Sequence, residues 1–231
     1  MLRSLVGSEM CIRDSNKATG VKIDDGSVIY SDKIVSNLNP KLLFSKLVNE
    51  EDVDKEYLRK ILNYKCGSGT FRMNVALSEL PDFTCLPGKI TSDHHKSGIV
   101  IAPTLTYMDK AFTDAKQYGW SKNPIVEMLI PSTVDPSLAP KGKHVASLFC
   151  QQFAPVLPRD KSWHDEKENA ASTIIDTVNK FAPNFKESII GKSILSPLDL
   201  EEKLGLVGGD IMPVSYTHLR AHETPEHRGW R

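Results

Sequence analysis

Arg72 and Asn74 have types and a spacing suited to ligand binding. They alternate with apolar residues over 70–77, which predicts a strand with these polar groups on one face and a core on the other. Phe149, Gln151 and Phe153 form a second stripe that combines aromatic rings with an amide. Both stripes could line a pocket for a small molecule. The alternatives are a solvated sheet face for the first stripe and a core strand with an edge amide for the second.

Other candidate motifs fit catalysis less well. Gly67-Ser68-Gly69 matches the start of the G-x-G-x-x-G dinucleotide motif, but Arg72 stands in place of the third glycine. A strand rather than a helix is also expected to follow. No G-x-S-x-G elbow is present, so nothing local favours a hydrolase. The carboxylates at 165, 166 and 168 open a long helix, where they complement its dipole. We name no catalytic residue.

Histidines are the remaining candidate ligands. His94 and His95 follow Asp93 but lack a third ligand at a useful spacing, which favours exposed polar residues over a metal site. The C-terminal segment holds three more histidines, His218, His222 and His227, in a stretch that resembles translated adapter sequence. We therefore expect no metal.

The elements that position these residues follow from periodicity and turn signals. Asp25-Gly26 predicts a type I′ hairpin between 20–23 and 27–30, and 33–36 is expected to continue as a strand. Two helices are expected between 40 and 63. Further strands are predicted at 70–77, 98–102, 125–130, 144–153 and 189–195, the third and fourth pairing as neighbours, with a long loop over 80–97. Helices are expected at 107–118, 163–182 and from 197. This order predicts an α+β fold with an antiparallel or mixed sheet and packed helices.

Composition limits the class of protein. The chain has 231 residues, 40% hydrophobic and 25% charged, with 29 basic and 29 acidic side chains. This balance gives no electrostatic footprint for nucleic acid, and no apolar run approaches the roughly 20 residues of a membrane span. Membrane association is thus expected to be peripheral at most. The four cysteines show no paired spacing, which favours reduced thiols in an intracellular compartment.

Four segments of the chain resemble the phytoene-dehydrogenase-related flavoproteins. They are GVKIDDGSVIYSDKIVSNLNP at 20–40, FRMNVALSELPDF at 71–83, IVEMLIPSTVDPSLAPKGKHVASLFCQQFAP at 125–155 and ILSPLDLEEKLGLVGGDI at 194–211. In that family an N-terminal Rossmann segment binds FAD, a middle region forms the substrate domain, and a glycine-rich C-terminal segment closes over the flavin. The resemblance implies that this chain is the middle section and lacks both Rossmann FAD-binding ends.

The resemblance also implies domain boundaries and site residues. Residues 1–15 and 213–231 are expected to be non-native, adapter-like ends. Residues 16–40 would form the hairpin and the strand returning to the FAD domain, and residues 41–212 the substrate domain. Asn37, Asn39, Pro40, Gly208 and Gly209 would contact the cofactor; Arg72, Asn74, Phe149 and Gln151 would line the substrate. Arg72 occupies the family's lysine position, which keeps the charge but changes its geometry.

The function implied by the resemblance is FAD-dependent hydride removal from a small apolar or amine-like substrate, of the dehydrogenase, desaturase or amine-oxidase kind. The parent protein would be an enzyme, while this chain alone would be inactive because it lacks a glycine-rich FAD fingerprint. A mitochondrial location rests on the resemblance alone. The alternative is a non-catalytic binding or interaction module derived from a flavoprotein substrate domain.

Overall fold

The protein divides into two compact units. The computed structural model describes residues 10–14, 17–67 and 69–211. Unit 1 contains the described residues up to Cys66 together with Leu204–Val207, and unit 2 contains Gly67–Lys203 together with Gly208–Ile211. Helices and two antiparallel sheets are present, which confirms the predicted α+β class.

Unit 1 begins with a three-stranded antiparallel sheet. Its strands, in the order β1-β2-β3, are β1 (Met10–Asp14), β2 (Lys17–Lys22) and β3 (Val28–Tyr30). The predicted hairpin is present between β2 and β3, but the turn type is wrong. Only Gly26 has a positive φ, of 84°, and its N–H donates to the Ile23 carbonyl. Asp25 instead accepts from the Ser27 N–H at 2.8 Å, so the loop is a turn closed by one left-handed glycine.

Unit 1 contains one strand that was not predicted and lacks one that was. β1 forms within residues 1–15, which were expected to be a non-native end, and pairs with β2. Conversely, 33–36 is not a strand, and Val35 is 94% exposed. A short apolar pair such as Ile34 and Val35 is strand-like only where a neighbouring strand accepts its backbone hydrogen bonds. No described strand does so here.

The rest of unit 1 contains the two predicted helices. The first runs through α1 (Pro40–Leu42) into the π-helical turn η1 (Leu43–Leu47). A 3-10 turn, η2 (Glu50–Asp52), then leads to α2 (Lys55–Leu62), whose first turn is capped by the Asp54 side chain. Helix α2 buries Leu58 and Ile61.

Unit 2 is built on a five-stranded antiparallel sheet of order β5-β6-β7-β4-β8. In chain order its strands are β4 (Thr70–Leu77), β5 (Ile99–Ile101), β6 (Ile125–Leu129), β7 (His144–Gln151) and β8 (Ile189–Leu195). All five lie within the ranges predicted from the sequence, and β6 pairs with β7 as expected.

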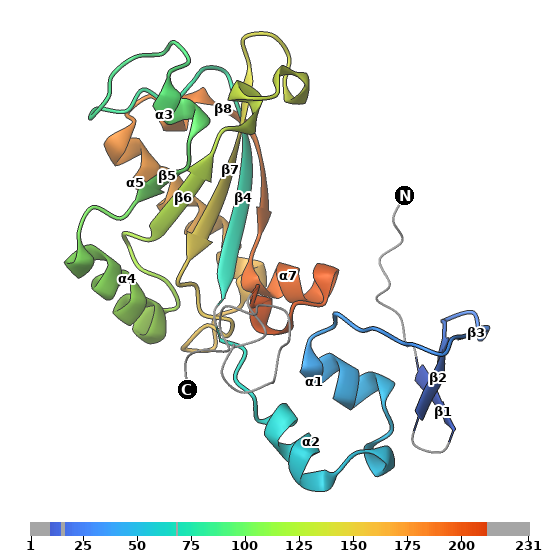
Figure 1. Cartoon of the computed structure of the whole chain (residues 1–231). Coiled ribbons are helices and arrows are strands. Elements are labelled where there is room, and N and C mark those ends of the chain that lie inside the picture. The colour runs from blue at the N-terminus through green and yellow to red at the C-terminus, as the bar shows by residue number, and fades with distance from the viewer. Residues whose placement is uncertain (1–9, 15–16, 68, 212–231) are drawn as a thin grey trace, which may run out of the picture. The chain divides into compact units, whose positions relative to one another are not determined.

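One face of this sheet forms the core of unit 2. The long helix α5 (Trp163–Phe181) buries Ile174 and Val178 in the same apolar cluster as Met73 and Leu148 of the sheet. Figure 1 shows α5 behind the sheet; among the described residues of unit 2, no helix crosses the opposite face. The sheet therefore has one packed face and one open face.

Shorter elements close the ends of the sheet. They are α3 (Asp93–Lys96), α4 (Leu105–Tyr118), η3 (Pro131–Thr133), η4 (Pro136–Leu138), α6 (Phe185–Ser188), α7 (Pro197–Leu204) and η5 (Val207–Gly209). Helix α4 ends at Gly119, whose φ of 99° confirms the predicted stop. The segment at 80–97, expected to be a loop throughout, contains α3. The beginning of this segment is held by Asn184, whose side chain donates to the Leu80 carbonyl and accepts from the Asp82 N–H.

Candidate functional site

The open face of unit 2 carries the polar and aromatic residues of the candidate site. The side chains that alternate away from α5 include buried Thr70 and Ile125 at one end of the sheet. We define the open face by members of this set that are half-buried or exposed, namely Arg72, Asn74, Val100, Glu127, Leu129, Ser147, Phe149, Gln151 and Ser193. Two of its apolar members are largely exposed, Val100 at 62% and Leu129 at 56%. Exposed apolar side chains grouped beside polar ones occur at ligand-binding surfaces, although single ones are common on any protein surface.

Three residues of the open face stand in one row across neighbouring strands. The antiparallel register pairs Phe149 of β7 with Glu127 of β6 on one side and with Arg72 of β4 on the other. All three side chains are half-buried. Across the three strands, the row therefore presents an anion, then an aromatic ring, then a cation.

Arg72 is held by contacts with β7. Its guanidinium carbon lies 5.1 Å from the centroid of the Phe149 ring, a cation–π distance. Its Nη2 donates to Ser147 Oγ at 3.5 Å, the long limit of a hydrogen bond. The burial pattern of β4 alternates from Phe71 to Leu77, as expected, while Thr70 is buried. Asn74, on the same face, lies one row farther along and is exposed, with Ser147 and Ser193 as its register partners.

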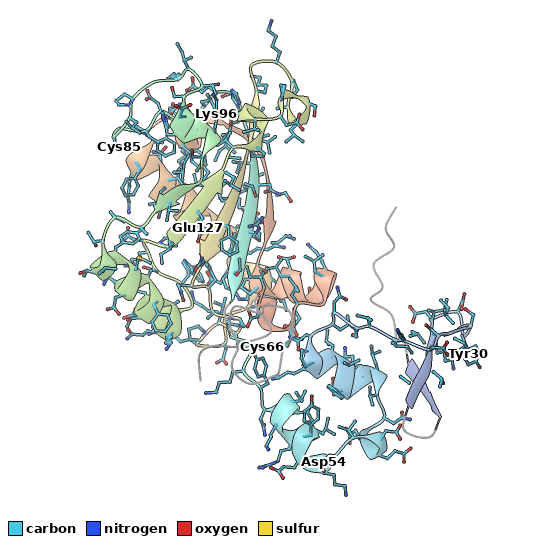
Figure 2. All side chains as sticks on the ribbon, in the orientation of Figure 1. Tyr30, Asp54, Cys66, Cys85, Lys96 and Glu127 are labelled. Carbon is cyan, nitrogen blue, oxygen red and sulfur yellow. The ribbon has the colours of Figure 1, made fainter. Side chains whose placement is uncertain are left out.

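Glu127 is the residue that sequence reasoning missed. Gln151 Nε2 donates to Glu127 Oε1, which joins the predicted Gln151 to a carboxylate on the adjacent strand. The signal was present, because Glu127 is the single charged side chain in an otherwise apolar strand at 125–130. Figure 2 shows Glu127 on the sheet of unit 2. Its neighbours depend on the β6–β7 register, which the sequence does not reveal.

The prediction that Phe153 shares a face with Phe149 is wrong. Phe153 is 1% exposed and packs in the core, with ring centroids 5.2 Å from Phe71 and 6.2 Å from Trp163. The strand ends at Gln151, and Gln152 takes a left-handed φ of 65°. This conformation breaks the alternation and turns the next side chain to the other side of the sheet.

The expected cofactor residues of unit 1 have local structural roles. Asn39 caps α1 by accepting from the Lys41 N–H at 2.9 Å, and Pro40 occupies the first helical position. The Asn39 amide also donates to Cys66 Sγ at 3.5 Å. Asn37 is exposed. The cap accounts for the Asn-Pro pair without a ligand.

The expected cofactor glycines of unit 2 are also explained locally. Gly208 and Gly209 have φ values of 66° and 62°, which favour glycine. A Cβ on Gly209 would lie 2.5 Å from Pro197 Cα, and the Gly208 N–H donates to Glu201 Oε2 at 3.0 Å. These contacts account for the two glycines without a ligand, and their contact with a cofactor stays a prediction.

The Gly67–Gly69 segment leads directly into a strand, as expected. β4 begins at Thr70, immediately after Gly69. Gly69 is required because the backbone of Phe153 approaches it closely. A Cβ at position 69 would lie 1.9 Å from the Phe153 carbonyl oxygen. Packing rather than phosphate binding explains this glycine.

His95 is not the exposed residue that was expected. It is fully buried at 0% exposure, its Nδ1 accepts from the Ser92 N–H at 3.2 Å, and its Nε2 lies 3.0 Å from the Pro81 carbonyl. These partners require a proton on Nε2 and none on Nδ1. His95 thus anchors the loop, and no group of three potential metal ligands occurs among the described residues. His218, His222 and His227 lie outside the described residues.

Burial lowers the pKa of two histidines beside His95. The pKa values of His94 and His144 are both depressed, first by desolvation and then by the nearby His95. Ser132 Oγ lies 3.4 Å from His144 Nδ1, and Thr133 Oγ1 donates to the His95 carbonyl at 3.0 Å. The histidines belong to the packing at the end of the sheet where β7 begins, and not to the row at Phe149.

Known proteins similar to this chain in sequence include oxidoreductase-family members. Two similar curated proteins carry the name pyridine nucleotide-disulfide oxidoreductase domain-containing protein 2: the chain is 33% identical to that of Rattus norvegicus and 32% identical to that of Mus musculus, each over 228 residues. Each match covers 95% of this chain and 39% of the relative, so the chain spans about two-fifths of their length. Prolycopene isomerase 2 of an Oncidium hybrid cultivar is 26% identical over 78% of the chain and 28% of its own length.

The structural comparison shows a shared fold. A crystal structure of an oxidoreductase from Methanosarcina mazei matches 81% of this chain and 36% of its own, with a TM-score of 0.53 and 17% identity. No family model matches the sequence. In the described part of the chain, no helix is both long and apolar enough to cross a membrane. The domain boundaries and the roles of the site residues remain predictions.

Proposed function

We propose that this chain forms the substrate-binding part of a FAD-dependent oxidoreductase. The proposal is supported by its sequence similarity to pyridine nucleotide-disulfide oxidoreductase domain-containing protein 2. The open face of unit 2 is one wall of the substrate site. A cavity needs a second wall. We assign this second wall, and the binding of FAD, to the additional residues of a protein as long as the relatives. The substrate is a small apolar or amine-like molecule, and no metal or nucleic acid takes part.

The asymmetry of the sheet carries this proposal. One face is closed by α5 into a fully buried core, as Met73 and Leu148, both at 0% exposure, illustrate. The other face keeps half-buried Arg72 and Phe149 next to exposed Val100 and Leu129. A face with partial burial, exposed apolar area and a few placed polar groups has the composition of a ligand site.

The residues of the open face position the substrate in this proposal. When bound, FAD supplies the chemistry by accepting a hydride from a substrate C–H. The Phe149 ring gives an apolar floor, while Arg72 and Gln151 provide the directional contacts that hold one orientation. Because these side chains orient rather than react, we assign no acid or base among them.

The test is the flavin content of a longer protein. A version of the relatives' length, purified and then denatured, is expected to release stoichiometric FAD, whereas the present chain is expected to bind none tightly. A longer protein without flavin contradicts the oxidoreductase proposal. If its open face nevertheless bound a ligand, the non-catalytic binding module would be favoured, consistent with the closed core of unit 2.

A further inference from the structure

Arg72 and Glu127 are opposite charges on the open face, and neither is neutralised by a described residue. The polar contact of the Arg72 guanidinium is the long one with Ser147, and its other contact is the Phe149 ring. Among the described residues it forms no ion pair with a carboxylate. A half-buried guanidinium has lost part of its hydration and leaves several N–H donors available.

Glu127 is in the matching situation. Its hydrogen-bond donor is the neutral amide of Gln151, and in the described part of the chain it forms no ion pair with a cation. The amide orients the carboxylate without cancelling its charge. The second carboxylate oxygen can therefore accept from a ligand.

The register keeps these two charges apart. Arg72 and Glu127 flank Phe149 on neighbouring strands, so their backbones are separated by two strand spacings, or about 10 Å. Because all three side chains lie on the same face, Phe149 stands between Arg72 and Glu127 in the row. A ligand with a cation at one end, an anion at the other and methylene groups between them would match the row in charge and in polarity.

We propose that this row binds a zwitterion, namely an amine-bearing carboxylic acid whose two charged groups are separated by a short apolar chain. The ammonium group binds Glu127, the carboxylate binds the planar fork of Arg72, and the methylenes pass beside Phe149 between them. The inference rests on the proposed function in taking this ligand as representative of the substrate class. It narrows the expected amine-like substrate to one that also carries an anionic group.

Binding to the present chain tests the proposal without turnover. The probe is 6-aminohexanoate, compared with hexanoate and hexylammonium, which each lack one of its charges; affinities are measured by chemical-shift titration. We expect 6-aminohexanoate to bind about tenfold more tightly than either, a ratio that corresponds to about 1.4 kcal/mol. Equal affinities for the three probes, or no binding of 6-aminohexanoate, would overturn the proposal.

Variants assign each end of the ligand. In Arg72→Gln, 6-aminohexanoate is expected to lose its higher affinity relative to hexylammonium. In Glu127→Gln, it is expected to lose its higher affinity relative to hexanoate. Arg72→Lys keeps the charge but loses the fork, so a reduced advantage should remain. Lys192→Gln is the matched control, because Lys192 pairs with Glu168 of α5, on the packed side of the same sheet. An advantage that survives Arg72→Gln, or that Lys192→Gln also abolishes, contradicts the assignment.

This experiment separates the two proposals. If the longer protein contains FAD but the row does not prefer the zwitterion, the oxidoreductase function is supported and the proposed substrate class is wrong. If the longer protein contains no flavin but the row prefers the zwitterion, the ligand class is supported and the oxidoreductase function is wrong.

Discussion

The charged residues of the open face are held by aromatic and amide partners rather than by each other. Phe149 supports Arg72, and Gln151 supports Glu127. Surface ion pairs elsewhere in unit 2, such as that between Lys186 and Asp176 at 2.8 Å, join their charges directly. Arg72 and Glu127 differ from these pairs in having uncharged partners.

Histidine burial predicts an acid sensitivity of unit 2. Because the pKa of His144 is lower in the folded protein than the ordinary value of 6.5, the unfolded chain takes up its proton first as pH falls. The free energy of unfolding should therefore decrease as pH drops below about 6.5 and gain nothing from this group above it. We expect urea midpoints measured between about pH 7.5 and about pH 5.5 to fall less steeply in His144→Asn than in the natural sequence.

The control for this prediction is His164→Asn. The His164 side chain is 66% exposed, so this variant makes the same change of residue type without removing a buried contact. Parallel pH dependence in the natural sequence and in His144→Asn would contradict the assignment to His144.

At the scale of elements, the start of β4 is fixed by its contact with the segment that follows β7. The Phe153 N–H donates to the Gly69 carbonyl at 3.2 Å, and the Phe153 carbonyl faces the position of a Gly69 Cβ. The same crossing places Phe153 in the core beside Phe71. Strand β4, which carries Arg72, therefore depends on this close approach.

Gly69→Ala is expected to destabilise unit 2. The added methyl group must displace backbone rather than a flexible side chain, so we expect a loss of about 1–3 kcal/mol in the free energy of unfolding. Urea unfolding followed by circular dichroism measures it. Gly67→Ala is the matched control, since a Cβ there meets nothing within 4 Å, and its effect should stay within about 0.5 kcal/mol. Equal losses in the two variants would refute the packing explanation.

At the scale of the molecule, the two units differ in how much apolar surface they bury. Every member of the main hydrophobic cluster lies in unit 2, whereas from residue 18 to Cys66 the buried hydrophobic residues are Leu58 and Ile61. Because burial is the dominant stabilising contribution to folding, the units should differ in local stability.

Hydrogen exchange followed by mass spectrometry should show this difference directly. We expect the amides of β4 and β7, at the centre of the five-stranded sheet, to exchange at least about a hundredfold more slowly than those of α2 and β3. A fully deuterated unfolded sample provides the reference for each peptide. Comparable protection across β4, β7, α2 and β3 would show that the units are equally stable.

Local sequence signals were sufficient for most elements of unit 2. Alternation over 70–77 places a strand with Arg72 and Asn74 on one face, and Gly119 marks the end of α4. Both depend on periodicity and backbone preference within a few residues, which the sequence contains. The resemblance of four segments likewise predicted the relationship that the comparisons show.

The tertiary structure alone decided which side chains meet. Glu127 joins the row of Phe149 and Arg72 through the register of three strands, and a shift of one residue would place it on the opposite face. The left-handed Gln152 moves Phe153 into the core, and the packing around α3 buries His95. These outcomes depend on contacts between segments distant in the chain, whose energies no local pattern records.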